Sequence, residues 1–105
     1  MGQESVKFYA NEVTMTYEVM KGKQKQTMRS NFSGNKIKYV TIEPCQERML
    51  FKSVPSERIV IKADGVVGPI VYYQSKEQEY FEDYKNGFRK FCRENGVILN
   101  DKARI

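Results

Sequence analysis

Residues 75–96, SKEQEYFEDYKNGFRKFCRENG, carry the strongest structural signal in this 105-residue chain. Aromatic residues recur there at spacings of three and four, which place them on one face of a helix: Phe81, Tyr84, Phe88 and Phe91. Ser75 and Gln78 match a capping box that starts a helix, and Asn95-Gly96 matches a stop signal. The pattern therefore predicts an amphipathic helix over residues 76–94.

The aromatic side chains of this helix are expected to turn inward. Full burial of one large apolar side chain stabilises a fold by about 1.5–3 kcal/mol, while small domains have a net stability of only about 5–15 kcal/mol. We therefore expect the stripe to cover the open face of a sheet, with a partner-binding face as the alternative. Gly87, which costs up to about 1 kcal/mol inside a helix, indicates a close backbone approach or a kink.

The residues before position 75 read as short strands separated by turns. In residues 13–19 apolar and polar residues alternate, which is the pattern of a half-buried strand. Gly22 fits a hairpin turn, Pro44 and Pro55 are expected to end or break their strands, and Pro69 is expected at a strand start or a sheet edge. The other strand-like segments are residues 6–10, 24–32, 36–43, 49–54, 58–63 and 68–74.

This spacing of short strands favours a mainly β (α+β) fold. We expect a small antiparallel β-sandwich or partly open barrel of six to seven strands, capped by one C-terminal amphipathic helix. The length predicts a single domain over residues 1–105, with strands within 6–73, the helix at 76–94 and a tail at 97–105. In the segment 36–43, the core candidates are Ile37, Ile42 and either Tyr39 or Val40.

Positive charge is concentrated in one part of the chain. The net charge is +5, and no acidic residue lies between Glu18 and Glu43. The lysines of the first hairpin alternate in sequence, so we expect them to share one strand face and to act together. A solvated hairpin that protects an edge strand is the alternative. The candidate binding patch, called the basic segment below, consists of Lys21, Lys23, Lys25, Arg29, Lys36 and Lys38.

The residue types of an enzyme site are scarce. The chain has no histidine, no glycine-rich phosphate loop and no nucleophile-elbow motif, so neither catalytic residues nor a metal site nor a cofactor is expected. Cys45 and Cys92 are far apart in sequence and are interpreted as reduced thiols. Residues 1–10 do not match a secretory signal, so the expected location is the cytoplasm, with peripheral membrane attachment as a variant.

Several segments resemble the pleckstrin-homology-like (PH-like) superfold, and within it the small bacterial PH-like domains. They are NKIKYVTIEPC at 35–45, RIVIKADG at 58–65, PIVYYQS at 69–75 and the aromatic helix. The resemblance implies a scaffold that holds phosphoinositide headgroups, peptides or protein partners at strand loops, or along the groove between helix and sheet. It also implies that basic residues in and after the first hairpin, here Lys21 to Arg29, are the ligand-binding ones.

Three functions are compatible with these patterns. The first is a non-enzymatic binding or scaffold module that recognises a protein or peptide partner, with an anionic lipid surface as a further ligand. The alternative is a nucleic-acid-binding protein that uses the basic segment over residues 21–38, which requires exposed aromatic rings such as Tyr39. The third is a ribonuclease-type toxin that depends on Arg29 or Glu43.

Overall fold

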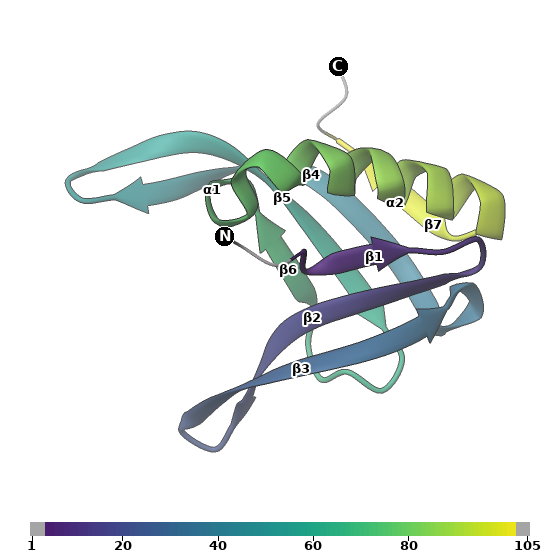
Figure 1. Ribbon diagram of the computed structural model, residues 1–105. Helices are drawn as coiled ribbons and strands as arrows, with labels where there is room; N and C mark the ends of the chain where they lie inside the picture. Colours follow the sequence, from purple (N-terminus) through teal and green to yellow (C-terminus); the bar gives the residue numbers. More distant parts are fainter. Residues whose placement is uncertain (1–3, 103–105) are drawn as a thin grey trace.

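The computed structural model describes residues 4–102, so the outer residues of the expected domain and the end of the predicted tail lie outside the described part. Seven strands in this range form two sheets, and one long helix lies across their open side (Figure 1). The first sheet has the order β1-β2-β3, with bounds Val6–Phe8, Glu12–Lys21 and Gln24–Ser33. The second has the order β6-β5-β4-β7, with bounds Ile70–Tyr73, Lys52–Ala63, Ile37–Met49 and Ile98–Asp101.

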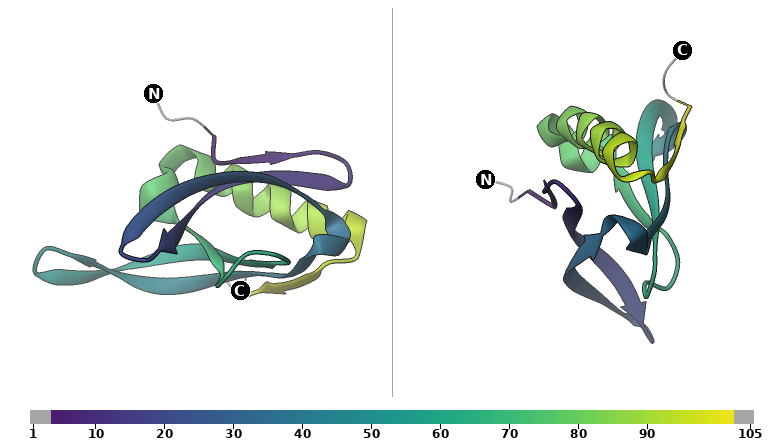
Figure 2. Two further views of the ribbon diagram at one scale, coloured as in Figure 1. Left: turned by 90° about the horizontal axis from the view of Figure 1, so that it is seen from below. Right: turned by 90° about the vertical axis from the view of Figure 1, so that its right-hand side faces the viewer.

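The expected fold class, a small β-sandwich with a C-terminal helix, is confirmed. Seen end-on, the two sheets diverge and helix α2 (Phe81–Asn95) covers the gap between them (Figure 2). All four aromatic side chains of the stripe are buried, and they share one core with residues of both sheets. The prediction that the stripe belongs to the core is therefore confirmed. The sheet residues of this core include Val13, Met15, Ile42, Ile59 and Ile61.

The start of the helical region differs from the expected capping box. A short helix α1 (Gln74–Glu77) ends at Gln78, whose φ of 52° breaks the helix, and a 3-10 turn, η2 (Gln78–Tyr80), leads into α2. Ser75 caps nothing, because its hydroxyl donates a hydrogen bond to Oε1 of Glu47 at 2.5 Å. The expected stop is present, since Gly96 adopts the left-handed conformation with φ of 67°.

Strands β4 and β5 run through the prolines that were expected to interrupt them. Met49 pairs with Lys52 across a two-residue turn, and these flanking residues form the closing hydrogen-bonded pair. Hydrogen-bonded and non-hydrogen-bonded pairs alternate from there along the ladder, and Pro44 and Pro55 both belong to non-hydrogen-bonded pairs. Their backbone nitrogen atoms therefore point away from the partner strand. The missing N–H groups therefore remove no hydrogen bond of the β4–β5 ladder, and the predicted breaks are wrong. Pro69 precedes the edge strand β6, as predicted.

Two irregularities complete the second sheet. The pairing register of β4 with β5 shifts between Ile37 and Tyr39, so Ile37 and Val40 both face the core while Tyr39 is exposed. The segment expected as a tail contains β7, which pairs with β4 at Tyr39–Ile42. This pairing is parallel because α2 returns the chain to the end of the sheet at which β4 begins.

Gly87 allows β1 to approach the helix closely, as the sequence suggested. A Cβ atom at this position would overlap the ring of Phe8, which packs edge-on against Phe88 with ring centroids 4.9 Å apart.

We predict that Gly87→Ala lowers the free energy of unfolding by about 1–3 kcal/mol, because the Phe8 ring must move out of a packed cluster. The effect opposes the helix propensity of alanine, which by itself would stabilise α2 by about 1 kcal/mol. Urea unfolding measures the change, and Lys90→Ala on the exposed face of α2 is the matched control. A Gly87→Ala protein as stable as the wild type would contradict the close packing of β1 on α2.

Candidate functional site

The structure divides the lysines of the first hairpin between two faces. Gly22 and Lys23 form the turn between β2 and β3, and Lys21 pairs with Gln24. Because the chain reverses there, Lys21 lies on the face that carries Val19 and Tyr17, whereas Lys25 lies on the opposite face beside Met20. The expectation that the three lysines share one strand face is therefore wrong, although all three are exposed at the hairpin end.

The rest of the basic segment is spread along β3. Arg29 lies midway, where its Nη1 donates to Oγ1 of Thr16 at 2.6 Å. Lys36 belongs to the turn η1 (Gly34–Lys36) and Lys38 to β4, both beyond the far end of β3. The strand from Lys25 to Ser33 spans about 25 Å at the usual rise per residue. Lys38 also forms an exposed ion pair with Asp64 at 3.6 Å. The basic segment is thus divided into three lysines at the hairpin end, Arg29 in the middle of β3, and Lys36 and Lys38 beyond its far end.

Strand β3 is the edge of the first sheet and has an open side. Gln24 belongs to the hydrogen-bonded pair that closes the hairpin. Every second residue of β3 from Lys25 to Asn31 is therefore in a non-hydrogen-bonded pair and turns its backbone N–H and C=O groups away from β2. These residues are Lys25, Thr27, Arg29 and Asn31, and no described residue forms a backbone hydrogen bond with these outward groups. All four side chains are exposed. The open edge therefore combines free backbone groups with two cations.

A cleft of about 340 Å³ separates the two sheets beside α1. One wall is β2 where it extends past β1, and the other is the edge strand β6. The hydroxyl of Tyr72 donates to the carbonyl oxygen of Thr16 at 2.8 Å and so bridges the walls. Burial raises the pKa of Tyr72 far above that of a free tyrosine, and burial likewise raises the pKa of Glu77 at the rim. The bridge leaves an opening whose lining is about equally polar and apolar.

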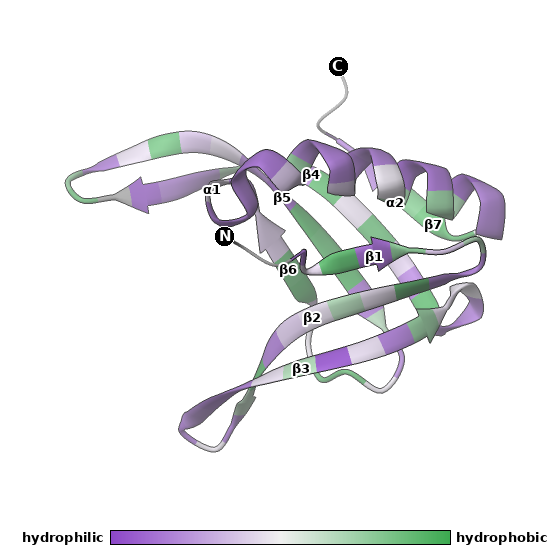
Figure 3. Cartoon of the chain, viewed as in Figure 1, coloured by the Kyte–Doolittle hydropathy of each residue, from purple (hydrophilic) through white to green (hydrophobic). Residues whose placement is uncertain are grey.

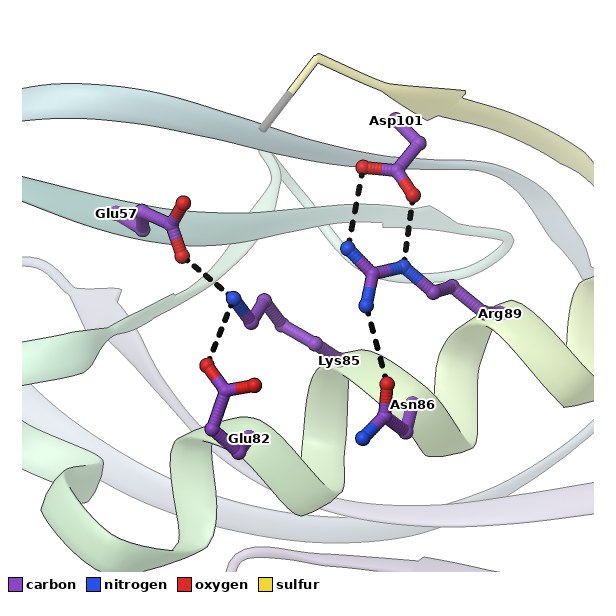
Figure 4. A network of polar contacts seen from close by, with 6 residues as sticks. All are labelled: Glu57, Glu82, Lys85, Asn86, Arg89 and Asp101. Atoms are coloured by element: carbon purple, nitrogen blue, oxygen red, sulfur yellow. Dashed lines mark hydrogen bonds and ion pairs between the residues drawn. The ribbon is translucent and has the colours of Figure 1, made fainter. Parts of the chain in front are cut away.

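The charged side of α2 is attached to the second sheet by ion pairs (Figure 4). Lys85 Nζ lies 2.7 Å from a carboxylate oxygen of Glu57 on β5 and 2.8 Å from one of Glu82. Arg89 donates through Nε to Asp101 on β7 at 2.7 Å. The partners on the sheet, Glu57 and Asp101, lie 28 and 12 residues from Lys85 and Arg89 along the chain, so no sequence pattern indicated these ion pairs. Their role is to fix α2 on the sheet.

The buried ammonium of Lys85 keeps its charge through this arrangement. Burial by itself would lower the pKa of Lys85, but the hydrogen bonds from the ammonium to Glu57 and Glu82 raise it above the ordinary value. Because the folded-state pKa is raised, the pair stabilises the fold below about pH 10.5, the pKa of an unfolded lysine, and the contribution is lost as the pH rises through the folded-state value.

We predict that Lys85→Ala lowers the free energy of unfolding by about 2–3 kcal/mol, since it leaves Glu57 half-buried without its cation. The double variant Lys85→Met/Glu57→Gln removes both charges and is expected to be more stable than Lys85→Ala. Arg93→Ala, on the exposed face of α2, provides the control for a lost surface charge. Equal stability of Lys85→Ala and Arg93→Ala in urea unfolding would show that the pair does not hold the helix.

The reactive groups of the chain are held in structural contacts. Burial raises the pKa of the Cys92 thiol to about 11 and also raises that of Cys45, so both thiols are protonated near neutral pH. Glu43 accepts a hydrogen bond from Arg58 at 2.7 Å, on the sheet that does not contain Arg29. Within residues 4–102, no group of three His, Cys, Asp or Glu side chains is placed to hold a metal ion. The absence of catalysis stays a prediction.

Comparison with known proteins adds no assignment. No family model, curated protein or solved structure matches this chain. None of the helices in the described part of the chain is long and apolar enough to span a membrane.

Proposed function

We propose that this chain is a non-enzymatic, PH-like binding module whose partner supplies an acidic, extended peptide segment. The order of the elements supports the PH-like assignment: two meanders of three strands are followed by a helix that covers the gap between the sheets. Strand β7, which follows the helix and joins the second sheet, is an addition to that order.

The open edge of β3 is the observation that carries the proposal. A peptide in an extended conformation pairs with such an edge through backbone hydrogen bonds, and side chains beside the edge then select its sequence. Four residues of β3 offer outward N–H and C=O groups along one continuous line. The register with β2 is regular over the whole strand, so no bulge interrupts the line.

The charges beside this edge select an acidic partner. Lys25 and Arg29 alternate with Thr27 on the outer face of β3, and both are exposed. The acidic residues on the same face, Glu18 and Glu12, lie on β2 opposite Thr27 and Ser33 and away from the open edge. A peptide with carboxylates at alternate positions would place them near the two cations. We therefore expect its affinity to fall as salt is added.

Nucleic-acid binding is the second candidate, and one observation favours it. Tyr39, about one-third exposed, follows Lys38 and lies near Lys36, so a stacking ring and cations occur together at the far end of β3. The cations of the hairpin end are separated from this group, which gives a single strand of nucleic acid no continuous basic track. The peptide-binding proposal needs no such track.

We predict that Thr27→Pro weakens binding of an acidic peptide about tenfold or more relative to Thr27→Ala. Proline removes the outward N–H of residue 27 without breaking the ladder to β2, as edge strands tolerate. The probe is a fluorescein-labelled peptide that alternates Glu with Thr, and fluorescence anisotropy measures its Kd.

The matched control is a peptide that alternates Lys with Thr, for which no binding is expected. Equal affinity of Thr27→Pro and Thr27→Ala for the acidic probe would contradict pairing at this edge. Salt-sensitive binding of labelled poly(U), lost in Tyr39→Ala but kept in Thr27→Pro, would instead support the nucleic-acid alternative.

A further inference from the structure

The end of the β4–β5 hairpin exposes two large apolar side chains. Leu50 is 92% exposed and Phe51 is 100% exposed, and they form the two-residue turn between Met49 and Lys52. The hairpin extends well past β6 and β7, which pair only with its inner half. Figure 3 shows its tip as an apolar spot at the end of a largely polar arm. Such a tip meets no part of the described core.

The backbone at this tip is strained, because a leucine occupies a position whose conformation favours glycine. Leu50 has a φ of 52°, a conformation that costs little for glycine and more for a residue with a Cβ atom. The other two-residue hairpin turn, between β2 and β3, has Gly22 at the same position with a φ of 66°. Glycine would thus serve the fold equally well at position 50. A leucine that is both strained and exposed indicates a role outside the fold.

Cations flank the apolar tip. Arg48 and Lys52 are exposed on either side of the turn. Two acidic residues of the same hairpin, Glu43 and Glu57, lie nearer its base and are paired with Arg58 and Lys85. The third, Glu47, is next to Arg48 but accepts a hydrogen bond from Ser75 of α1. The outer end of the arm is therefore apolar and positively charged.

The β2–β3 hairpin ends in a similar way. Met20 is 63% exposed there, next to Lys21 and opposite Lys25, and Lys23 lies in the turn. Both hairpin ends project from the same side of the molecule, at the left of Figure 1 and of the left panel of Figure 2. Two separate tips on one side can contact one flat surface at the same time.

We propose that these two tips dock the protein on an anionic lipid bilayer. In this arrangement, Leu50 and Phe51 enter the interface between headgroups and acyl chains, while Arg48, Lys52 and the lysines of the β2–β3 tip contact anionic headgroups. A bilayer accepts a narrow apolar tip without a preformed pocket, and basic residues near its surface add to binding. A protein partner would need a complementary pocket, because two residues at a tip bury far less area than a stable interface requires.

The proposal extends the function argued above and does not depend on it. The peptide would pair with β3 at residues 25–31, whereas the lipid contacts lie at the two tips, and Lys25 is the residue that the two sites share. A protein that binds vesicles through the tips could fail to bind the acidic peptide, and the reverse is also possible. Variants at the β4–β5 tip, which belongs to the other sheet, are therefore expected to leave the Kd of the peptide unchanged.

The absence of tryptophan from the chain makes a direct test possible. Phe51→Trp places a single reporter at the tip, and Val67→Trp places one at an equally exposed position, 96%, in the loop between β5 and β6. With vesicles of phosphatidylcholine containing 30% phosphatidylserine, we expect the emission of Phe51→Trp to shift to the blue and to be quenched by spin-labelled acyl chains. The emission of Val67→Trp is expected to stay unchanged.

Vesicle sedimentation then separates the contribution of the apolar tip residues to membrane binding from that of the charged ones. Leu50→Gly/Phe51→Ser should reduce partitioning about tenfold or more while keeping the folded state, because glycine suits the backbone at position 50. Arg48→Gln/Lys52→Gln should reduce it severalfold on anionic vesicles, unlike the control Lys90→Gln/Arg93→Gln on α2.

Three results would overturn the proposal. One is an unshifted Phe51→Trp emission at saturating lipid. Another is an equal shift for Val67→Trp. The third is a shift that occurs without vesicles and grows with protein concentration, which would assign the tip to contact with a second copy of this chain.

Discussion

The packing of one aromatic helix face against two diverging sheets is the constraint on which the structure depends. The sheets share few direct strand contacts, and the rings of Phe81, Tyr84, Phe88 and Phe91 fill the space between them. Ion pairs from Lys85 and Arg89 attach the other side of α2 to the second sheet. The helix is therefore a structural part of the core and leaves no broad apolar face for a partner.

This arrangement leaves the strands as the place for the proposed binding functions. Since α2 seals the core, the outer halves of β2–β3 and β4–β5 carry no core residues and extend as two-stranded arms. Such arms expose strand edges and turns that the core does not constrain. The two proposed functions use these features: the open edge of β3 for an acidic peptide, and the two tips for an anionic bilayer. Together they describe a module that would present a partner at a membrane surface.

The sequence was informative wherever periodicity reports burial. The spacing of the aromatic residues predicted the buried helix face. Gly87 indicated a close approach or a kink, and the structure shows the close approach, made by Phe8. It was misleading at Pro44 and Pro55, because whether a proline breaks a strand depends on which way its nitrogen faces, and that is fixed by a turn several residues away. Strand β7 was missed because four residues joined in parallel to a distant strand leave almost no local signal.

The candidate site shows the same limit. The charged residues were identifiable, yet the turn at Gly22-Lys23 that separates Lys21 from Lys25 depends on register. The exposure of Leu50 and Phe51 could not be predicted, because an apolar pair in a strand-like segment normally indicates burial. Amide hydrogen exchange tests the sealing role of α2 most directly. If α2 closes the core, its buried-face amides will exchange with the same opening free energy as those at the centres of β2 and β5. Exchange of α2 at a clearly lower opening free energy would show that the helix detaches from an independently stable pair of sheets.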